Sequence, residues 1–223
     1  MDVMEYILAK FRDPLSGLTH CIGALLAVTG LVLLVCKAAS PAKPWHIVSF
    51  SIFGSGMVLL YTASTLYHWL PLTDRGIACF RKIDHMMIFV LIAATYTPVC
   101  LVPLRGGWGW SIFGSVWGLA VTGMFLKLFW IGAPRWLSTS IYLAMGWMAV
   151  VGVWPLIQKL QAGALLWLLV GGVFYTVGAV IYGVKKPNPW PPHIGFHEIF
   201  HVFVVLGTLS HFWVMYRYII AFA

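Results

Sequence analysis

The chain has 223 residues, of which 61% are hydrophobic and only 9% are charged. Soluble domains carry about 25% charged residues, so this composition excludes a soluble globular protein and predicts a polytopic membrane protein. The net charge of +8 comes from basic residues that stand singly or in pairs between apolar runs. This distribution argues against a nucleic-acid partner and favours topology signals and contacts to lipid headgroups.

The first element that we expect is a short amphipathic helix at the N-terminus, lying on the membrane surface. Apolar residues recur there at helical spacing, with charged residues elsewhere on the turn: Val3, Met4, Ile7, Leu8 and Phe11. Asp13 and Pro14 then indicate a helix cap followed by proline at the first helical position.

Seven transmembrane spans follow, each long enough to cross a bilayer. We place them at about 15–36, 45–69, 83–102, 108–130, 136–157, 162–183 and 196–217. Tryptophans mark many of their ends and prolines mark the loops. The sequence therefore predicts an all-α fold in one domain, residues 1–223, built as a seven-helix transmembrane bundle.

A GxxxG pattern, Gly114 and Gly118, lies in the fourth of these spans. The pattern is typical of helices that approach closely. It indicates tight packing inside the bundle or between subunits, and the second case would give a homo-oligomer through glycine-rich helix faces. Membrane lipids are the other partners that we expect.

The basic residues predict the orientation. Nine of them fall on one side of the membrane: Lys10, Arg12, Arg75, Arg81, Lys82, Lys127, Arg135, Lys185 and Lys186. Five fall on the other side: Lys37, Lys43, Arg105, Lys159 and Arg217. The positive-inside rule then places the N-terminus in the cytoplasm and the C-terminus outside, in the plasma (cell inner) membrane.

Two histidines, His197 and His201, open the last span four residues apart. This spacing puts both imidazoles on one helix face, with their Cβ atoms about 6 Å apart. Ionisable groups in a membrane helix are costly unless they have a partner or a function. The predicted topology brings three other polar residues to the same membrane depth, because Ser64 and His68 end the second span and Asp84 begins the third.

Three imidazoles match the ligand count of a catalytic zinc site with one open position. We therefore predict a Zn²⁺ site with His68, His197 and His201 as ligands. Asp84 would bind a zinc-bound water or orient a ligand histidine, and Ser64 lies one turn from His68 on the same face. The alternative is that each histidine is an ordinary interfacial or hydrogen-bonded residue.

The remaining histidines fit the site less well. His85 points about 100° away from Asp84. His20 lies at the correct depth without a partner in its own helix, so it is a reserve candidate. Three others fall outside the cluster: His46, His193 and His211.

The segment from His197 to His201 also matches H-E-x-x-H, in which Glu198 would be the general base of a metalloprotease. Intramembrane proteases with this motif typically carry it in an early helix and have an aspartate ligand downstream. Here the motif opens the final span and only His211 follows it. The protease is therefore the less favoured hypothesis.

Together, Ser64-Thr65-Leu66-Tyr67-His68, Asp84 and His197-Glu198-Ile199-Phe200-His201 resemble the S-x3-H, D and H-x3-H motifs of the hemolysin III branch of the progestin and adiponectin receptor superfamily. The resemblance covers essentially the whole chain. It implies seven helices with the N-terminus inside, zinc on His68, His197 and His201, and Asp84 and Ser64 close to the bound water.

The leading functional hypothesis is a zinc-dependent hydrolase of a membrane lipid, such as a ceramide-like amide, with Asp84 or Glu198 accepting the proton. The substrate class follows from the resemblance. The alternative is a non-catalytic lipid sensor or homeostasis protein with a structural zinc, which would use the same ligands. A pore is less favoured, because these spans lack the polar stripe that a channel needs.

Overall fold

The computed structural model describes residues 11–130, 132–191 and 193–222, which fold almost entirely into helices. The long helices are α2 (Pro14–Ala39), α3 (Pro44–Trp69), α4 (Asp74–Leu101), α5 (Gly107–Phe129), α8 (Ala162–Val184) and α9 (Phe196–Arg217). The shorter ones are α6 (Arg135–Gly146), η1 (Trp147–Val150), α7 (Val153–Lys159) and η2 (Ile219–Ala221). The predicted all-α fold is confirmed for the described residues.

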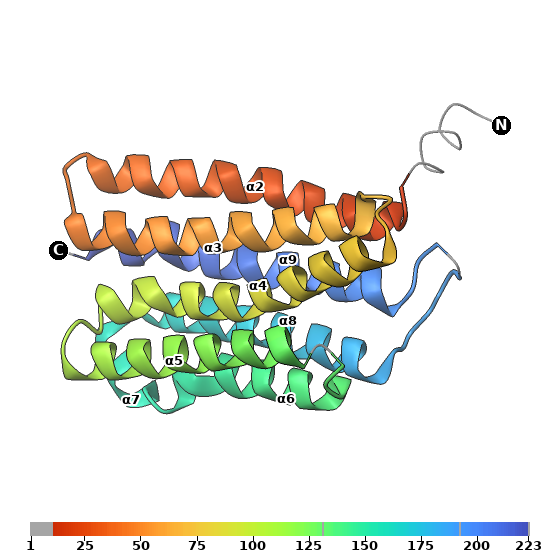
Figure 1. Ribbon diagram of the computed structural model, residues 1–223. Helices are drawn as coiled ribbons and strands as arrows, with labels where there is room; N and C mark the ends of the chain where they lie inside the picture. Colours follow the sequence, from red (N-terminus) through yellow and green to blue (C-terminus); the bar gives the residue numbers. More distant parts are fainter. Residues whose placement is uncertain (1–10, 131, 192, 223) are drawn as a thin grey trace.

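The helices lie side by side in an elongated bundle (Figure 1). α2 packs on α3 and α9, α3 packs on α4, α4 packs on α5, and α8 packs on α9. The starts of α2, α4 and α9 and the end of α3 lie together at one end of the bundle, opposite the C-terminus (Figure 1). The polar residues that the sequence singled out on these helices therefore share one end of the molecule.

Five described segments are long and apolar enough to cross a membrane: α2, α3, α5, α8 and Phe196–Ala221. A sixth counts if Trp136–Val150 and Val153–Lys159, which meet at a bend of 49°, form one broken span. Many large apolar side chains face outward, including Leu25 at 67% and Phe129 at 80% exposure, as expected of helices that face lipid. The chain is an integral membrane protein. Helix α4 is not among these segments, and the count of seven spans stays a prediction.

Two of the predicted ranges need correction. The range 136–157 is not one helix but α6, η1 and α7. Pro155 lacks the N–H that a continuous helix would donate to the carbonyl of Val151, and Gly152 adds backbone freedom beside it. Helix α4 begins at Asp74, well before residue 83, because the hydroxyl of Thr73 caps it by accepting a hydrogen bond from Gly76 N at 3.4 Å.

The GxxxG pattern does not pack inside the bundle. A Cβ atom added at Gly114 or Gly118 would meet no described atom within 4 Å. By contrast, a Cβ atom added at Gly123, in the next turn of α5 after Gly118, would lie 2.2 Å from the ring of Phe89 in α4. Close helix packing in α5 therefore depends on Gly123, and contact between subunits at Gly114 and Gly118 stays a prediction.

The chain is described from Phe11 onward, so the predicted N-terminal amphipathic helix lies almost entirely outside the described residues. Pro14 occupies the start of α2, as predicted. Asp13 occupies the N-cap position, as predicted, but its side chain makes no capping hydrogen bond to α2. The carboxylate has another partner, which belongs to the candidate site.

Candidate metal centre

Three histidines from two helices meet at this end of the bundle. His68 is in the last turn of α3, and His197 and His201 are in the first two turns of α9. The Nε2 atoms of His68 and His197 are 3.1 Å apart, and the three potential ligand nitrogens all lie within 4.8 Å of one another. The structure thus brings together the three residues predicted as ligands, close enough to hold a metal ion.

The start of α9 is fixed by hydrogen bonds that place His197 and His201. The N–H of Gly195 donates to Oε2 of Glu198 at 2.8 Å, and the N–H of Phe196 donates to Oδ1 of Asn188 at 3.0 Å. These bonds satisfy backbone donors that the first helical turn leaves free. Because the helix begins at Phe196, its first two turns present both histidines toward the end of α3.

Asp13 holds His68. Its Oδ2 atom lies 3.1 Å from Nδ1 of His68, and its N–H donates to the carbonyl of His68 at 2.9 Å. The Nε atom of Arg12 donates to the same carboxylate oxygen at 3.0 Å. The hydrogen bond from His68 and the neighbouring Arg12 lower the pKa of Asp13. An ionised carboxylate only accepts, so Nδ1 of His68 carries the hydrogen and Nε2 is left free to bind a metal.

His201 is held in the same way by the backbone of α2. Its Nδ1 atom lies 3.1 Å from the carbonyl oxygen of Ser16 and 3.1 Å from the hydroxyl of Thr19. A carbonyl oxygen accepts only, so Nδ1 carries the hydrogen and Nε2 of His201 is free. Asp13 and the first turns of α2 thus fix the tautomers of two potential ligands that belong to other helices.

These residues fit a metal with nitrogen ligands. Two nitrogens bound to a tetrahedral zinc at about 2.05 Å lie about 3.3 Å apart, and the observed Nε2–Nε2 distance between His68 and His197 is 3.1 Å. Nearby, the Oγ atom of Ser64 is buried and has no hydrogen-bond partner among the described residues. Buried hydroxyls nearly always have a partner, so this oxygen is suited to a water or a ligand at the site.

Asp84 lies near His68. Its side chain is 8% exposed, and it interacts electrostatically with His68 and with the Ser64 hydroxyl. The hydroxyl of Ser64 makes no regular hydrogen bond to a described residue, and Asp84 is a polar neighbour of this hydroxyl. Asp84 comes from α4, so three helices contribute to the site.

Glu198 uses both of its carboxylate oxygens for other contacts. Oε1 accepts a hydrogen bond from the hydroxyl of Ser16, and Oε2 accepts from Gly195 N. The side chain therefore ties the start of α9 to α2. This geometry disfavours Glu198 as a general base, and with it the protease hypothesis.

The other histidines are not among the three grouped residues, and His46 is buried within α3. His46 contacts the carbonyl of Ile219 at the far end of the bundle, and His211 contacts that of Gly207. His85 contacts the carbonyl of Arg81. His20, the reserve candidate, is not one of the grouped ligands, but its ring stacks on that of His201 at 3.6 Å between centroids.

Asp13 is the residue of this site that the sequence analysis missed. The only signal in the sequence was an acidic residue at the predicted membrane edge, at the same depth as the histidines. Its partner His68 is 55 residues away, and spacing within a helix says nothing about such a pair.

Comparison with known proteins agrees with the motifs. A family model described as "Haemolysin-III related" matches residues 8–212. The Hemolysin-3 homolog of Bacillus subtilis is 40% identical over 203 residues, which cover 91% of this chain and 92% of that protein. Hemolysin-3 of Bacillus cereus is 35% identical over 207 residues, covering 92% and 90%. The human monocyte to macrophage differentiation factor is 26% identical over 209 residues, covering 90% and 82%.

Proposed function

This chain belongs to the haemolysin-III-related family, and we propose that it is a zinc-dependent hydrolase that cleaves a membrane lipid, in particular a lipid amide. Family membership confirms the resemblance drawn from the motifs. The observation that supports the proposal is the convergence of His68, His197 and His201, whose ligand nitrogens lie within 4.8 Å of one another.

A catalytic zinc is favoured over a structural one by the number of ligands. Structural zinc sites are closed by four protein ligands, whereas catalytic sites have three and one open position. The group found among the described residues has three members, all histidines. When bound, the ion would supply a Lewis acid for the scissile carbonyl and would lower the pKa of a water molecule.

Asp84 is the proposed proton acceptor. It is buried beside His68 and Ser64, and it comes from a different helix than His197 and His201. The unpartnered hydroxyl of Ser64 would orient the attacking water. Glu198 has a structural role instead, because Ser16 and Gly195 occupy its oxygens.

The substrate class follows from the surroundings. The histidines lie at one end of a bundle of apolar, membrane-spanning helices, so a substrate with a hydrocarbon chain reaches them from the bilayer. The choice of an amide bond rests on the resemblance to the wider receptor superfamily. In the predicted orientation, this end of the bundle faces the cytoplasm of the cell, and the chain lies in the plasma membrane.

The experiment is an assay of fatty acid release by the purified full chain from mixtures of acyl lipids, including ceramide-like amides. We expect activity that a chelator removes and zinc restores. Asp84→Asn should lower the rate about 10²-fold or more while retaining zinc. Glu198→Gln is the matched control, since it makes the same chemical change one helix away.

Activity that survives both zinc removal and Asp84→Asn would contradict the proposal. A zinc-loaded protein without activity on any acyl lipid would instead favour the alternative, a lipid sensor in which the ion joins α3 to α9.

A further inference from the structure

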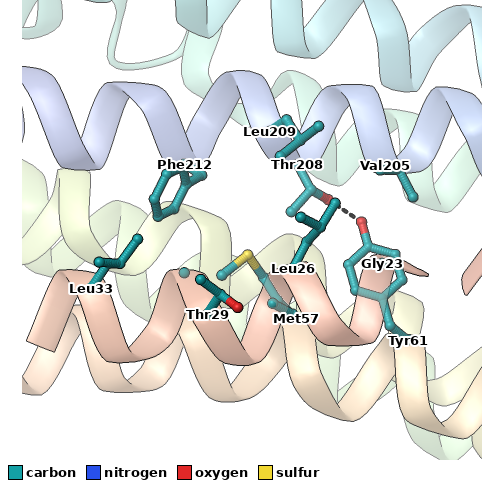
Figure 2. A pocket seen from close by; sticks show the side chains of 12 residues that line it. Gly23, Leu26, Thr29, Leu33, Met57, Tyr61, Val205, Thr208, Leu209 and Phe212 are labelled. Carbon is teal, nitrogen blue, oxygen red and sulfur yellow. Dashed lines mark hydrogen bonds between the residues drawn. The ribbon is translucent and has the colours of Figure 1, made fainter. Parts of the chain in front are cut away.

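An apolar groove runs along the bundle between α2, α3 and α9 (Figure 2). Its volume is about 170 Å³, and its lining includes Gly23, Gly30, Met57, Tyr61, Val205 and Phe212. The groove exists because α2 presents small residues to α9. A Cβ atom at Gly30, for example, would lie only 3.1 Å from the ring of Phe212.

The groove opens on the outer face of a membrane-spanning helix. Three of its lining residues are about half exposed: Leu26 at 45%, Leu33 at 46% and Leu209 at 40%. Helix α2 is one of the segments that can cross the membrane, so these side chains meet lipid tails. The hydroxyls that line the groove, those of Thr29, Tyr61 and Thr208, already donate hydrogen bonds within the bundle, so hydrocarbon is favoured over water as its occupant.

One end of the groove lies close to the candidate metal centre. Gly23 follows His20 by three residues and Val205 follows His201 by four, each about one helical turn, or roughly 5 Å along the axis. The ring of Tyr61 connects the two regions: it lines the groove and contacts the ring of His20 at 5.0 Å between centroids.

His20 lies at this junction. Its side chain is buried, and neither ring nitrogen has a hydrogen-bond partner among the described residues. A neutral imidazole always carries one donor and one acceptor, and leaving both unpaired inside a membrane protein is costly. The ring is held in place by stacking on His201 at 3.6 Å between centroids.

We propose that the groove binds the hydrocarbon chain of an acyl lipid and that His20 donates a hydrogen bond to the carbonyl group of the same lipid. The course of the groove agrees with the orientation of a lipid in the bilayer. A lipid in the leaflet on the side of the metal centre has its carbonyl at this end of the bundle and its chain pointing toward the midplane, which is the course of the groove. This inference deepens the proposed function, because the carbonyl would then lie beside His68, His197 and His201.

The test is photolabelling of the full chain in phosphatidylcholine vesicles. The probe is a long-chain fatty amide that carries a diazirine near its methyl end, and the protein carries Asp84→Asn so that the probe is not consumed. We expect saturable labelling near Leu33 and Phe212 that excess unlabelled amide competes away. His20→Phe should raise the half-saturating concentration about three- to tenfold, the loss expected for one hydrogen bond.

A matched pair of variants tests the groove itself. Thr29→Trp places a large side chain at a residue that lines the groove, whereas Val28→Trp places it on the neighbouring residue, which is 49% exposed and does not line the groove. We expect Thr29→Trp to remove most of the saturable labelling and Val28→Trp to leave it intact. Retention of bound zinc and of the thermal midpoint verifies that each variant is folded.

Three results would overturn the inference: labelling that does not saturate, labelling that maps to other helices, or labelling that Thr29→Trp leaves unchanged. Cross-links between two copies of the chain would show that a second subunit covers the groove instead. Saturable labelling of the groove together with an inactive wild-type protein would support the inference and contradict the hydrolase. Lipid hydrolysis by the wild-type protein, with labelling outside the groove, would support the hydrolase and contradict the inference about the groove.

Discussion

Replacing Asp13 with asparagine should weaken zinc binding about 10- to 100-fold. The carboxylate accepts a hydrogen bond from Nδ1 of His68 at 3.1 Å, and the side chain of His68 is only 4% exposed. A hydrogen bond to a charged group contributes about 1.5–3 kcal/mol, which corresponds to one to two factors of ten in affinity. Loss of such supporting partners in metalloproteins has effects of the same size.

Asparagine isolates the effect of the charge. It is nearly the same shape as aspartate, and the backbone bond from residue 13 to the carbonyl of His68, at 2.9 Å, is retained. The lowered pKa of Asp13 means that the carboxylate is ionised throughout the neutral range. Its contribution is therefore present at neutral pH and is lost only as the pH falls through this lowered value.

The assay is a competition titration of zinc between the purified chain and a chelator of known affinity. Asp74→Asn is the control, because Asp74 is an exposed acidic residue in the first turn of α4 at the same end of the bundle. We expect wild-type affinity for Asp74→Asn and the stated loss for Asp13→Asn. Equal affinity in both variants would refute the role of Asp13 as the residue that positions His68.

Two further predictions concern topology and the start of α9. A reporter fused after Ala223 should lie outside the cytoplasm and one inserted after Pro187 should lie inside; finding both on one side would contradict the predicted orientation. Glu198→Gln should lower the free energy of unfolding by about 1 kcal/mol, because the helix start loses charge-assisted bonds from Ser16 and Gly195, while zinc content stays largely intact. Zinc loss with unchanged stability would show that Glu198 acts on the metal rather than on the helix.

The helices and the three histidines could be predicted from the sequence because they depend on local patterns. Apolar runs place the spans, and the predicted range 45–69 differs by one residue from α3, Pro44–Trp69. The i, i+4 spacing places His197 and His201 on one face, and the alternation of spans brings His68 to the same end. Each of these predictions needs only residues that are close in the sequence, or the number of membrane spans between two positions.

The contacts between helices could not be predicted in this way. Asp13 reaches His68 because the start of α2 packs tightly on the end of α3: Trp69 donates to the carbonyl of Pro14 at 3.0 Å, and a Cβ atom on Gly17 would lie 2.0 Å from the ring of Trp69. No periodicity encodes that contact. Glu198 illustrates a different limit, because an H-E-x-x-H pattern and a helix-capping glutamate look alike until the neighbours of the carboxylate are known.

The most direct test of the account is the metal content of the purified chain and of single histidine variants. We predict about one zinc ion per chain in the wild type, and its loss in His197→Ala and His201→Ala, because two imidazoles bind zinc poorly. His193→Ala, which changes an exposed histidine in the loop before α9, should keep the metal. Full zinc retention in both His197→Ala and His201→Ala would contradict the proposed site.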